Sequence, residues 1–571
     1  VSREHSEGHM RGRALLCLAS IFFAVSAERT HGLFETRLLP ANCTGGELPL
    51  SGKYKTVEVV KYVDNCTLIG DPGTEVEVSG EIHFLQNAKL QGSITFRGTG
   101  LSGHRCVDVE GSLEFVEPNV EFINCGSKET EDGGGFYVEK DVIIQDGRVV
   151  ARGCTAEAGG CGFVGGNLLV NGGTVLFQDC RAWFGGGLYL KYGTYQQRGT
   201  SKIAFENCSG SSRGGGLFME VGSFHQHAGD LSFHRCFANS NGGGLYVNGS
   251  FHQSGVVEAK ECESHGFGGL ISATEVFILG AVGADGCKAR HGGCISGSEV
   301  TITGSFTARN CGAHDVGGAI STTAMKVRGH LEIQSCHAKV DGGAIHAGNL
   351  LFENATAHFQ NTSARRGGAI RASFVVQEGG KLWITNSRSR ERGGAIDSEM
   401  FFQRSGYASF TSCTAASGGA LELSFVESWG TMIFESCSAT ESGGAIFADL
   451  VGMMGRTSFN RCHSENAGGA IHARKMMQRG HLHVANCRAS LGGAVSLDIK
   501  IRSKKSGSWT KRWGNNDEWR NIEQKRLVAR LQRRKGAAGL HGDCSFQNCT
   551  GAVGCAMSVK GTILLNQSGK A

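Results

Sequence analysis

The chain has very little proline, and this shortage already restricts its class. Only 4 of the 571 residues are proline, all within the first 118 positions, whereas 88 are glycine. Collagen and low-complexity chains that are rich in glycine also carry much proline, so neither class fits. Glycine without proline predicts tight turns between hydrogen-bonded strands, because proline would remove donors from a sheet. The hydrophobic fraction of 40% indicates an ordered core.

Long apolar runs are also scarce, and the one that exists lies near the beginning. Two arginines follow Met10 and precede the apolar run 14–25, and small residues follow up to Ala27. This order is typical of a secretory signal peptide, and the run is shorter than the roughly 20 residues of a spanning helix. We therefore expect residues 1–27 to be an extension with a signal peptide. The protein is expected to be secreted or at the cell surface, with no further transmembrane segment.

Secretion changes the interpretation of the 22 cysteines, because an oxidising compartment permits disulfides. Cys43 and Cys66 are expected to form a local disulfide. Eight N-x-Ser/Thr acceptor sites are in keeping with an exported glycoprotein. They are Asn42, Asn65, Asn207, Asn248, Asn354, Asn361, Asn548 and Asn566.

A repeat of 24 to 28 residues covers most of the chain. Each copy ends a short apolar stretch with F-x-x-C or a variant of it, and Gly-Gly follows within seven residues. Asn361 and Asn386 replace the cysteine in two copies. After the Gly pair, apolar and variable positions alternate, and this period of two indicates a strand. The cysteines of the repeat are Cys154, Cys180, Cys208, Cys236, Cys262, Cys287, Cys311, Cys336, Cys413, Cys437, Cys462 and Cys487.

Short strands at this period bury a face only when they stack as coils. We predict an all-β fold, a right-handed parallel β-helix (solenoid) of about 15 coils, in which the Phe of one coil stacks on the Phe of the next. The predicted domains are an N-terminal β-rich cap with irregular first coils at 28–120, the β-helix at 121–499, a basic insertion at 500–540 and a resumed coil at 541–571.

Stacking would place the cysteines of the repeat in one column, one strand spacing apart. That spacing is within the Cα separation of a disulfide, so bonds between neighbouring coils are one alternative. In-register parallel strands seldom give the dihedral angle that a disulfide needs, and we therefore favour a column of reduced, buried thiols.

The basic insertion interrupts the repeat. Residues 500–535 hold 13 Lys and Arg against 3 acidic residues, so this segment carries +10 while the whole chain carries +5. We favour a solvated insertion or a translated intron. The alternative is a loop that binds anionic glycans, nucleic acid or acidic membrane.

The motif GGA(I/L) with F-x-x-(N/C) resembles the repeat of the chlamydial polymorphic outer membrane proteins. The resemblance covers about residues 122–495, with GGAI at 342–345 and 367–370 and FQN at 359–361. Those proteins are surface adhesins whose passenger is a right-handed β-helix of the pectin-lyase-like type. The resemblance therefore implies this fold and a role in adhesion. This chain mostly has Cys where the family has Asn, which weakens the functional part of the comparison.

Many β-helices cleave polysaccharides, and such sites need clustered carboxylates on one outer face. In the column after the Gly pair, Asp397 and Glu422 are neighbours and Arg371 lies one coil away. They are the only catalytic candidates, and a mixed-charge surface ladder is the competing interpretation. The sequence has no pattern that calls for a metal or a cofactor.

Further towards the N-terminus the same column is aromatic in five consecutive coils, at Tyr137, Phe163, Tyr189, Phe218 and Tyr246. An exposed strip of rings could stack on sugars or dock a protein. The alternative is a ladder that only stabilises the stacked strands. We expect a secreted or cell-surface binding or structural protein, adhesin-like, whose partner is an extracellular glycan or surface protein. A polysaccharide lyase or hydrolase is the second hypothesis, and no specific nucleic-acid binding is expected.

Overall fold

The structure is a computed structural model that describes residues 36–43, 46–100, 103–498, 538–540, 542–554, 556–560 and 563–565. The signal peptide, Asn566 and almost all of the basic insertion lie outside this part. Residues 36–571 form one compact unit. The described residues contain no α-helix, and hence no apolar helix long enough to cross a membrane.

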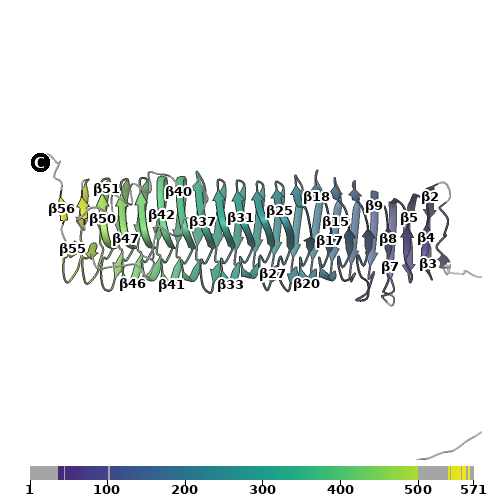
Figure 1. The fold of residues 1–571 in the computed structure, drawn as a ribbon, viewed down its shortest axis with the longest axis horizontal. Coiled ribbons are helices and arrows are strands. Elements are labelled where there is room, and N and C mark those ends of the chain that lie inside the picture. Colours follow the sequence, from purple (N-terminus) through teal and green to yellow (C-terminus); the bar gives the residue numbers. More distant parts are fainter. Residues whose placement is uncertain are drawn as a thin grey trace, which may run out of the picture. The chain divides into compact units, whose positions relative to one another are not determined.

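The fold is a parallel β-solenoid of about 18 coils. A 44-stranded sheet wraps around three faces of the coils, and a 12-stranded sheet forms a fourth, narrower face. Each strand pairs in parallel with the equivalent strand of the next coil. In Figure 1, strands of the narrow sheet such as β20, β27, β33 and β41 follow one another along one side of the stack.

The strands of the three wide faces differ mainly in length. The first face, after the Gly pairs, holds β4 (Val60–Tyr62), β6 (Ile82–Phe84), β8 (Val107–Val109), β10 (Phe136–Val138), β13 (Gly162–Val164), β17 (Leu188–Leu190), β21 (Leu217–Met219), β52 (Val495–Asp498) and β55 (Met557–Lys560). Longer strands continue from the first face into the second: β25 (Leu245–Gln253), β28 (Ile271–Ile278), β31 (Ile295–Ile302), β34 (Ile320–Val327), β37 (Ile345–Glu353), β40 (Ile370–Thr385), β42 (Ile396–Thr411), β44 (Leu421–Ser428), β47 (Ile446–Met453) and β50 (Ile471–Gln478). The second face also holds β2 (Glu47–Leu50), β5 (Cys66–Val78), β7 (Ala88–Gly98), β9 (Leu113–Ile123), β11 (Val142–Ile144), β14 (Leu168–Val170), β18 (Thr194–Gln197), β22 (Ser223–Gln226), β53 (Ala538–Leu540) and β56 (Ile563–Leu565).

The third face carries the Phe of the repeat, and the narrow face follows the Cys. The third face holds β1 (Arg37–Leu38), β3 (Lys53–Thr56), β12 (Arg148–Arg152), β15 (Thr174–Gln178), β19 (Lys202–Glu206), β23 (Asp230–His234), β26 (Val256–Lys260), β29 (Ala281–Asp285), β32 (Ser305–Arg309), β35 (His330–Gln334), β38 (Thr356–Gln360), β45 (Thr431–Glu435), β48 (Arg456–Asn460), β51 (His481–Ala485) and β54 (Cys544–Gln547). The narrow face holds β16 (Arg181–Phe184), β20 (Ser209–Arg213), β24 (Phe237–Ala238), β27 (Glu263–Ser264), β30 (Lys288–His291), β33 (Gly312–Val316), β36 (His337–Ala338), β39 (Ser363–Arg366), β41 (Arg388–Arg392), β43 (Thr414–Ser417), β46 (Ser438–Ser442) and β49 (His463–Ser464).

Two corners of each coil explain why the same residue types recur in successive copies of the repeat. The first Gly of a pair has positive φ, as at Gly342 with φ +62°, which L side chains rarely adopt. The second packs against the next coil, and a Cβ on Gly343 would lie 2.1 Å from the carbonyl oxygen of Gly368. The residue before the Cys is also left-handed, as at Asn310 with φ 53°, and Asn tolerates this conformation. In the two copies without a Cys, Asn361 and Asn386 hold this left-handed place, and the buried Thr362 and Ser387 hold the place of the Cys. The expected replacement of the Cys by Asn is therefore wrong.

The interior is a set of columns that run from coil to coil. Phe177, Phe205 and Phe233 stack with ring centroids 5.0 and 5.1 Å apart, and all three are buried. Stacking of the repeat Phe, as predicted, is therefore confirmed. Such offset aromatic pairs add to the burial of apolar area that holds the coils together.

The stack contains more coils than the sequence predicted. Strands β5, β7 and β9 already pair in parallel with one another, in register with later coils, although they lie within the expected cap. The Gly pair is not needed for this, because buried apolar residues alternate along these strands in the same way.

Candidate functional site

The five aromatic residues after the Gly pairs do form one column. Neighbouring rings stack at 4.8, 4.9, 5.0 and 5.2 Å from Tyr137 to Tyr246. The expected exposure is wrong for the middle three, because Phe163, Tyr189 and Phe218 are 3%, 7% and 5% exposed. Phe184 of the narrow face packs over them, and burial raises the pKa of the Tyr189 hydroxyl. The rings are thus a core ladder, with only the two end tyrosines partly open.

The three catalytic candidates lie next to one another but are not placed on an open surface. Asp397 pairs in register with Arg371 and with Glu422. Asp397 is fully buried with Arg371 Nε 3.2 Å from its Oδ2, and Glu422 is 6% exposed with Arg392 Nε at 3.6 Å. A polymer on the surface cannot reach carboxylates buried in this way.

The cysteine column has the predicted form with one exception. Eleven of its twelve members are free, buried thiols, whereas Cys180 forms a disulfide with Cys161, which lies outside the column. The expected Cys43–Cys66 disulfide is present, and Cys106–Cys125 is a third. All seven acceptor asparagines in the described residues are exposed, as glycosylation requires.

One group among the described residues brings three ligand atoms within 4.8 Å of one another: Glu81, His83 and Asp108. Burial, and then the neighbouring Asp108 carboxyl, raise the pKa of Glu81 to about 7. His83 lies 3.1 Å from Glu110, and Arg105 lies 3.7 Å from Asp108. The group is therefore balanced by protein charges without an ion.

A large concave feature of the described structure lies elsewhere, along the narrow face. It is a furrow of about 1020 Å³ over six consecutive strands, β27, β30, β33, β36, β39 and β41. At one strand spacing per coil it is about 24 Å long. We call it the basic furrow. Its floor is the strand backbone between the walls, at Ser264, Ala289, Ala313, Ala338 and Ala364, small residues whose buried side chains turn away from the furrow.

Two exposed rows of side chains form the walls of the basic furrow, because successive residues of a strand point to opposite faces. The small floor residues between them are at most 7% exposed. The first wall is Glu263, Lys288, Gly312, His337, Ser363 and Arg388. The second wall is His265, Arg290, His314, Lys339, Arg365 and Arg390, one basic residue in every coil.

The charge of the walls is strongly one-sided. Six Lys and Arg line the furrow against one acid, Glu263 at its end. Arg290 donates to Asp315 (Nε–Oδ2 2.6 Å), and Arg365 lies 3.9 Å from Glu391. The other four cations form no ion pair with any residue that the structure describes; they are Lys288, Lys339, Arg388 and Arg390.

Outer faces of the other coils show the opposite arrangement. There a base of one coil meets an acid of the next, as in Arg97–Glu75 and Lys89–Glu114, both at 2.8 Å, and Arg235–Glu261 at 3.0 Å. The hydrogen bond to Arg97 is the largest cause of the lowered pKa of Glu75. A run of cations on neighbouring strands is therefore peculiar to the furrow within the described coils.

Sequence reasoning missed this site although its pattern is visible. The residues one and three positions after the repeat Cys are basic in CKAR (287–290) and CHAK (336–339), around a central Ala. The predicted sites all lay in the column after the Gly pair. That a strand begins directly after the Cys was not evident from its short, mixed composition.

Comparison with known protein families, with curated proteins and with solved structures finds no match to this chain. The likeness to polymorphic outer membrane proteins thus depends on the repeat residues alone, while the parallel solenoid itself is shown.

Proposed function

We propose that this protein is a secreted or cell-surface β-helical binding protein that holds a linear anionic polysaccharide in the basic furrow. The observation that carries the proposal is the row of cations on neighbouring coils, four of them without an ion-pair partner. Like charges directly opposite one another on paired strands are destabilising, so this row costs the fold stability. An anionic ligand would offset that cost.

The shape of the furrow favours an extended polymer over a compact ligand. The floor is strand backbone, because the small residues between the walls turn inward, and the furrow runs across six strands. On the second wall the basic residues recur about every 4.8 Å. A polyuronate with one carboxylate on each sugar offers anions at comparably short intervals, whereas hyaluronan has one carboxylate on every second sugar.

Two further features favour a glycan over single-stranded nucleic acid as the ligand. Proteins that bind single strands usually stack bases on aromatic side chains, and no Phe, Tyr or Trp lines the furrow. The three disulfides and the exposed acceptor asparagines also suit an extracellular setting. The resemblance to surface adhesins supports the same setting.

A polysaccharide-cleaving function receives no support from the described residues. Asp397 and Glu422 are buried and ion-paired, and the furrow walls contain a single acid, Glu263. Glycoside hydrolysis needs two carboxyl groups that flank the scissile bond. The proposal is therefore retention of the polymer, not its cleavage.

The test is binding of the secreted full-length protein to polygalacturonate, heparin, hyaluronan, neutral dextran and single-stranded DNA at fixed ionic strength. We expect polygalacturonate to bind more tightly than hyaluronan, dextran not to bind, and affinity to fall with salt. Replacing Lys288, Lys339, Arg388 and Arg390 by Gln should weaken binding roughly 100-fold or more, at up to about 1 kcal/mol for each exposed pair.

A matched control removes the same charge elsewhere. Lys55, Lys140, Arg198 and Lys260 are exposed, lie outside the furrow and form no ion pair with described residues. Their replacement by Gln should leave affinity within about threefold. Equal losses in the two variants would show only attraction by overall charge and would contradict the proposal. Tighter binding of DNA than of every glycan would also contradict it.

A further inference from the structure

Three cysteines lie at the residue that directly precedes a first-face strand. Cys106 precedes β8, Cys161 precedes β13 and Cys294 precedes β31. All three are buried. The first residues of these strands belong to one continuous register, which runs from Val107 through Gly162 to Ile295. The three cysteines therefore occupy the same place in three different coils.

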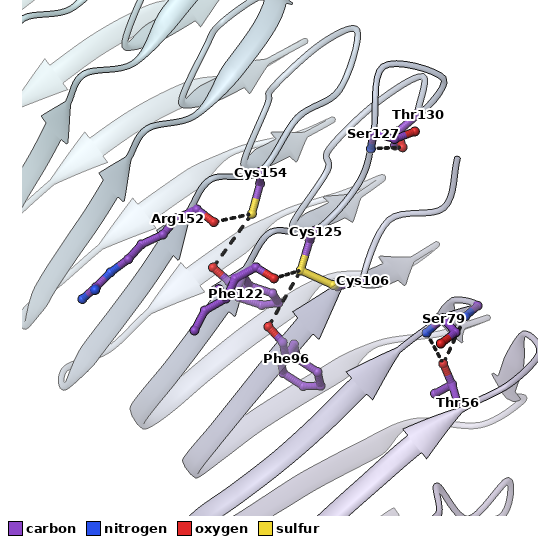
Figure 2. The surroundings of a disulfide bond; sticks show 12 residues. Thr56, Ser79, Phe96, Cys106, Phe122, Cys125, Ser127, Thr130, Arg152 and Cys154 are labelled. Atoms are coloured by element: carbon purple, nitrogen blue, oxygen red, sulfur yellow. Dashed lines mark hydrogen bonds between the residues drawn. A yellow bond between two sulfur atoms is a disulfide. The ribbon is translucent and has the colours of Figure 1, made fainter. Parts of the chain in front are cut away.

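Two of these three cysteines are bonded to the next cysteine of the repeat column. Cys106 bonds Cys125 and Cys161 bonds Cys180, with Cα–Cα distances of 5.5 and 5.6 Å and a sequence separation of 19 in both. Figure 2 shows the first of these disulfides, with the unbonded Cys154 one coil further along the column. Cys294 has the same kind of neighbour, because Cys311 is the next cysteine of the column.

The coil around Cys294 has its cysteines at the same places as the coil around Cys161. In each, one column cysteine stands seven positions earlier, Cys154 or Cys287, and another stands later, Cys180 or Cys311. Arg181 after Cys180 and Gly312 after Cys311 lie in one register of the narrow sheet. The later separation is two residues shorter in the second coil. One residue is missing from the corner between the first and second faces, and the other from the corner between the second and third faces.

The coil around Cys161 shows which of two neighbouring column cysteines forms the disulfide. Cys161 bonds the later Cys180, and the earlier Cys154 stays a buried free thiol whose Sγ lies 3.4 Å from the carbonyl oxygen of Arg152. Contacts with the thiols of Cys287 and then Cys294 are the largest causes of a raised pKa at Cys311. The three thiols of the second coil are therefore in mutual contact.

We propose that Cys294 and Cys311 form a fourth disulfide in the exported protein, while Cys287 remains a thiol. The bond forms by exchange with a disulfide-bearing oxidant of the exporting compartment: the two thiols lose two protons and two electrons, and the oxidant is reduced to two thiols. Because the folded thiols are buried, this exchange takes place before the coils close. The bond ties β31 to the start of β33, whose Gly312, Ala313 and His314 line the basic furrow.

The test is a map of the cysteines in the full-length protein after secretion. The protein is denatured without reductant in the presence of N-ethylmaleimide and digested with trypsin. Cleavage after Arg290 and Arg309 separates the three thiols, since Cys287 lies in 261–288, Cys294 in 291–309 and Cys311 in 310–326. We expect a cross-linked pair of 291–309 with 310–326, and maleimide on Cys287.

Two outcomes overturn the proposal: maleimide on both Cys294 and Cys311, or a cross-link between 291–309 and 261–288. Residues 153–181 form one tryptic peptide, which should carry maleimide on Cys154 alone because Cys161 and Cys180 are bonded, and this peptide is the internal standard. Cys287→Ala should retain the cross-link. Cys294→Ala is a mild exchange, because Ala319 and Ala344 hold this place in the next coils, and it should leave Cys311 fully alkylated.

Discussion

The basic furrow and its continuation beyond Arg392 share one backbone but differ in their walls. Both follow the narrow sheet, in the same parallel register, over a floor of small residues that includes Ala415, Ala439 and Ser464. Between Lys288 and Arg390 the walls are rich in Lys and Arg. In the continuation they are Thr414, Ala416, Ser438, Thr440, His463 and Glu465, without a single Lys or Arg.

This difference separates the requirements of the fold from those of a ligand. The Gly pair and the left-handed corner recur in both stretches, because the chain of each of these coils turns at these two places. The wall residues are not needed for the coils to stack, since they point to solvent. Cations gathered on a few coils, at a cost in stability, therefore indicate selection for binding.

The largest expected effect comes from giving the basic furrow the walls of its continuation. Lys339→Thr with Arg390→Ala introduces the residues found at Thr440 and Ala416. Loss of two cations at up to about 1 kcal/mol each should weaken polygalacturonate binding roughly 30-fold. Calorimetry or surface plasmon resonance at low salt measures this. Thr440→Lys with Ala416→Arg is the reverse exchange, and it should not weaken binding. Unchanged affinity in the first variant would show that the wall residues do not contribute to binding.

The fold could be predicted because its requirements repeat in every coil. A corner of the coil is directly indicated by a Gly pair, as at 342–343 or 468–469. A core position is directly indicated by the repeat Phe, as at 434 and 459. Features that depend on a contact between different parts of a coil were not predictable. Burial of Tyr189 depends on Phe184, which reaches it from the narrow face, and the pattern of either segment alone does not show this.

The coil number and the furrow were missed for two further physical reasons. In β5 and β7 buried apolar residues alternate although no Gly pair precedes the coil, so a search for that pair finds the first coils too late. The furrow arises where wall residues of six separate coils come together. Each coil contributes only one or two basic side chains, and a single copy of the repeat looks like an ordinary solvated turn.

A smaller effect is expected at Asp315, which competes with the ligand. Its carboxylate accepts from Arg290 at 2.6 Å and lies 3.0 Å from His314, and these contacts lower its pKa. Asp315→Asn should release the Arg290 guanidinium and tighten polygalacturonate binding roughly threefold at neutral pH. A lowered pKa means that the pairing is present above the unfolded pKa and is lost as pH falls through the folded one. The advantage of the variant should therefore shrink in acid, which titration of the affinity against pH would test.

The smallest effect concerns stability and has the opposite sign to the effect on binding. Lys339 lies between His314 and Arg365 on the second wall, so Lys339→Glu would create the acid–base neighbours that other coils have. The free energy of unfolding should rise by about 0.5 kcal/mol while polygalacturonate binding falls. Thr440→Glu places the same acid beside Glu441 and Glu465 in the continuation and should give no gain. Urea denaturation of both variants measures the difference. A loss of stability in Lys339→Glu would mean that the row of cations carries no strain, and the argument that a ligand must offset it would fail.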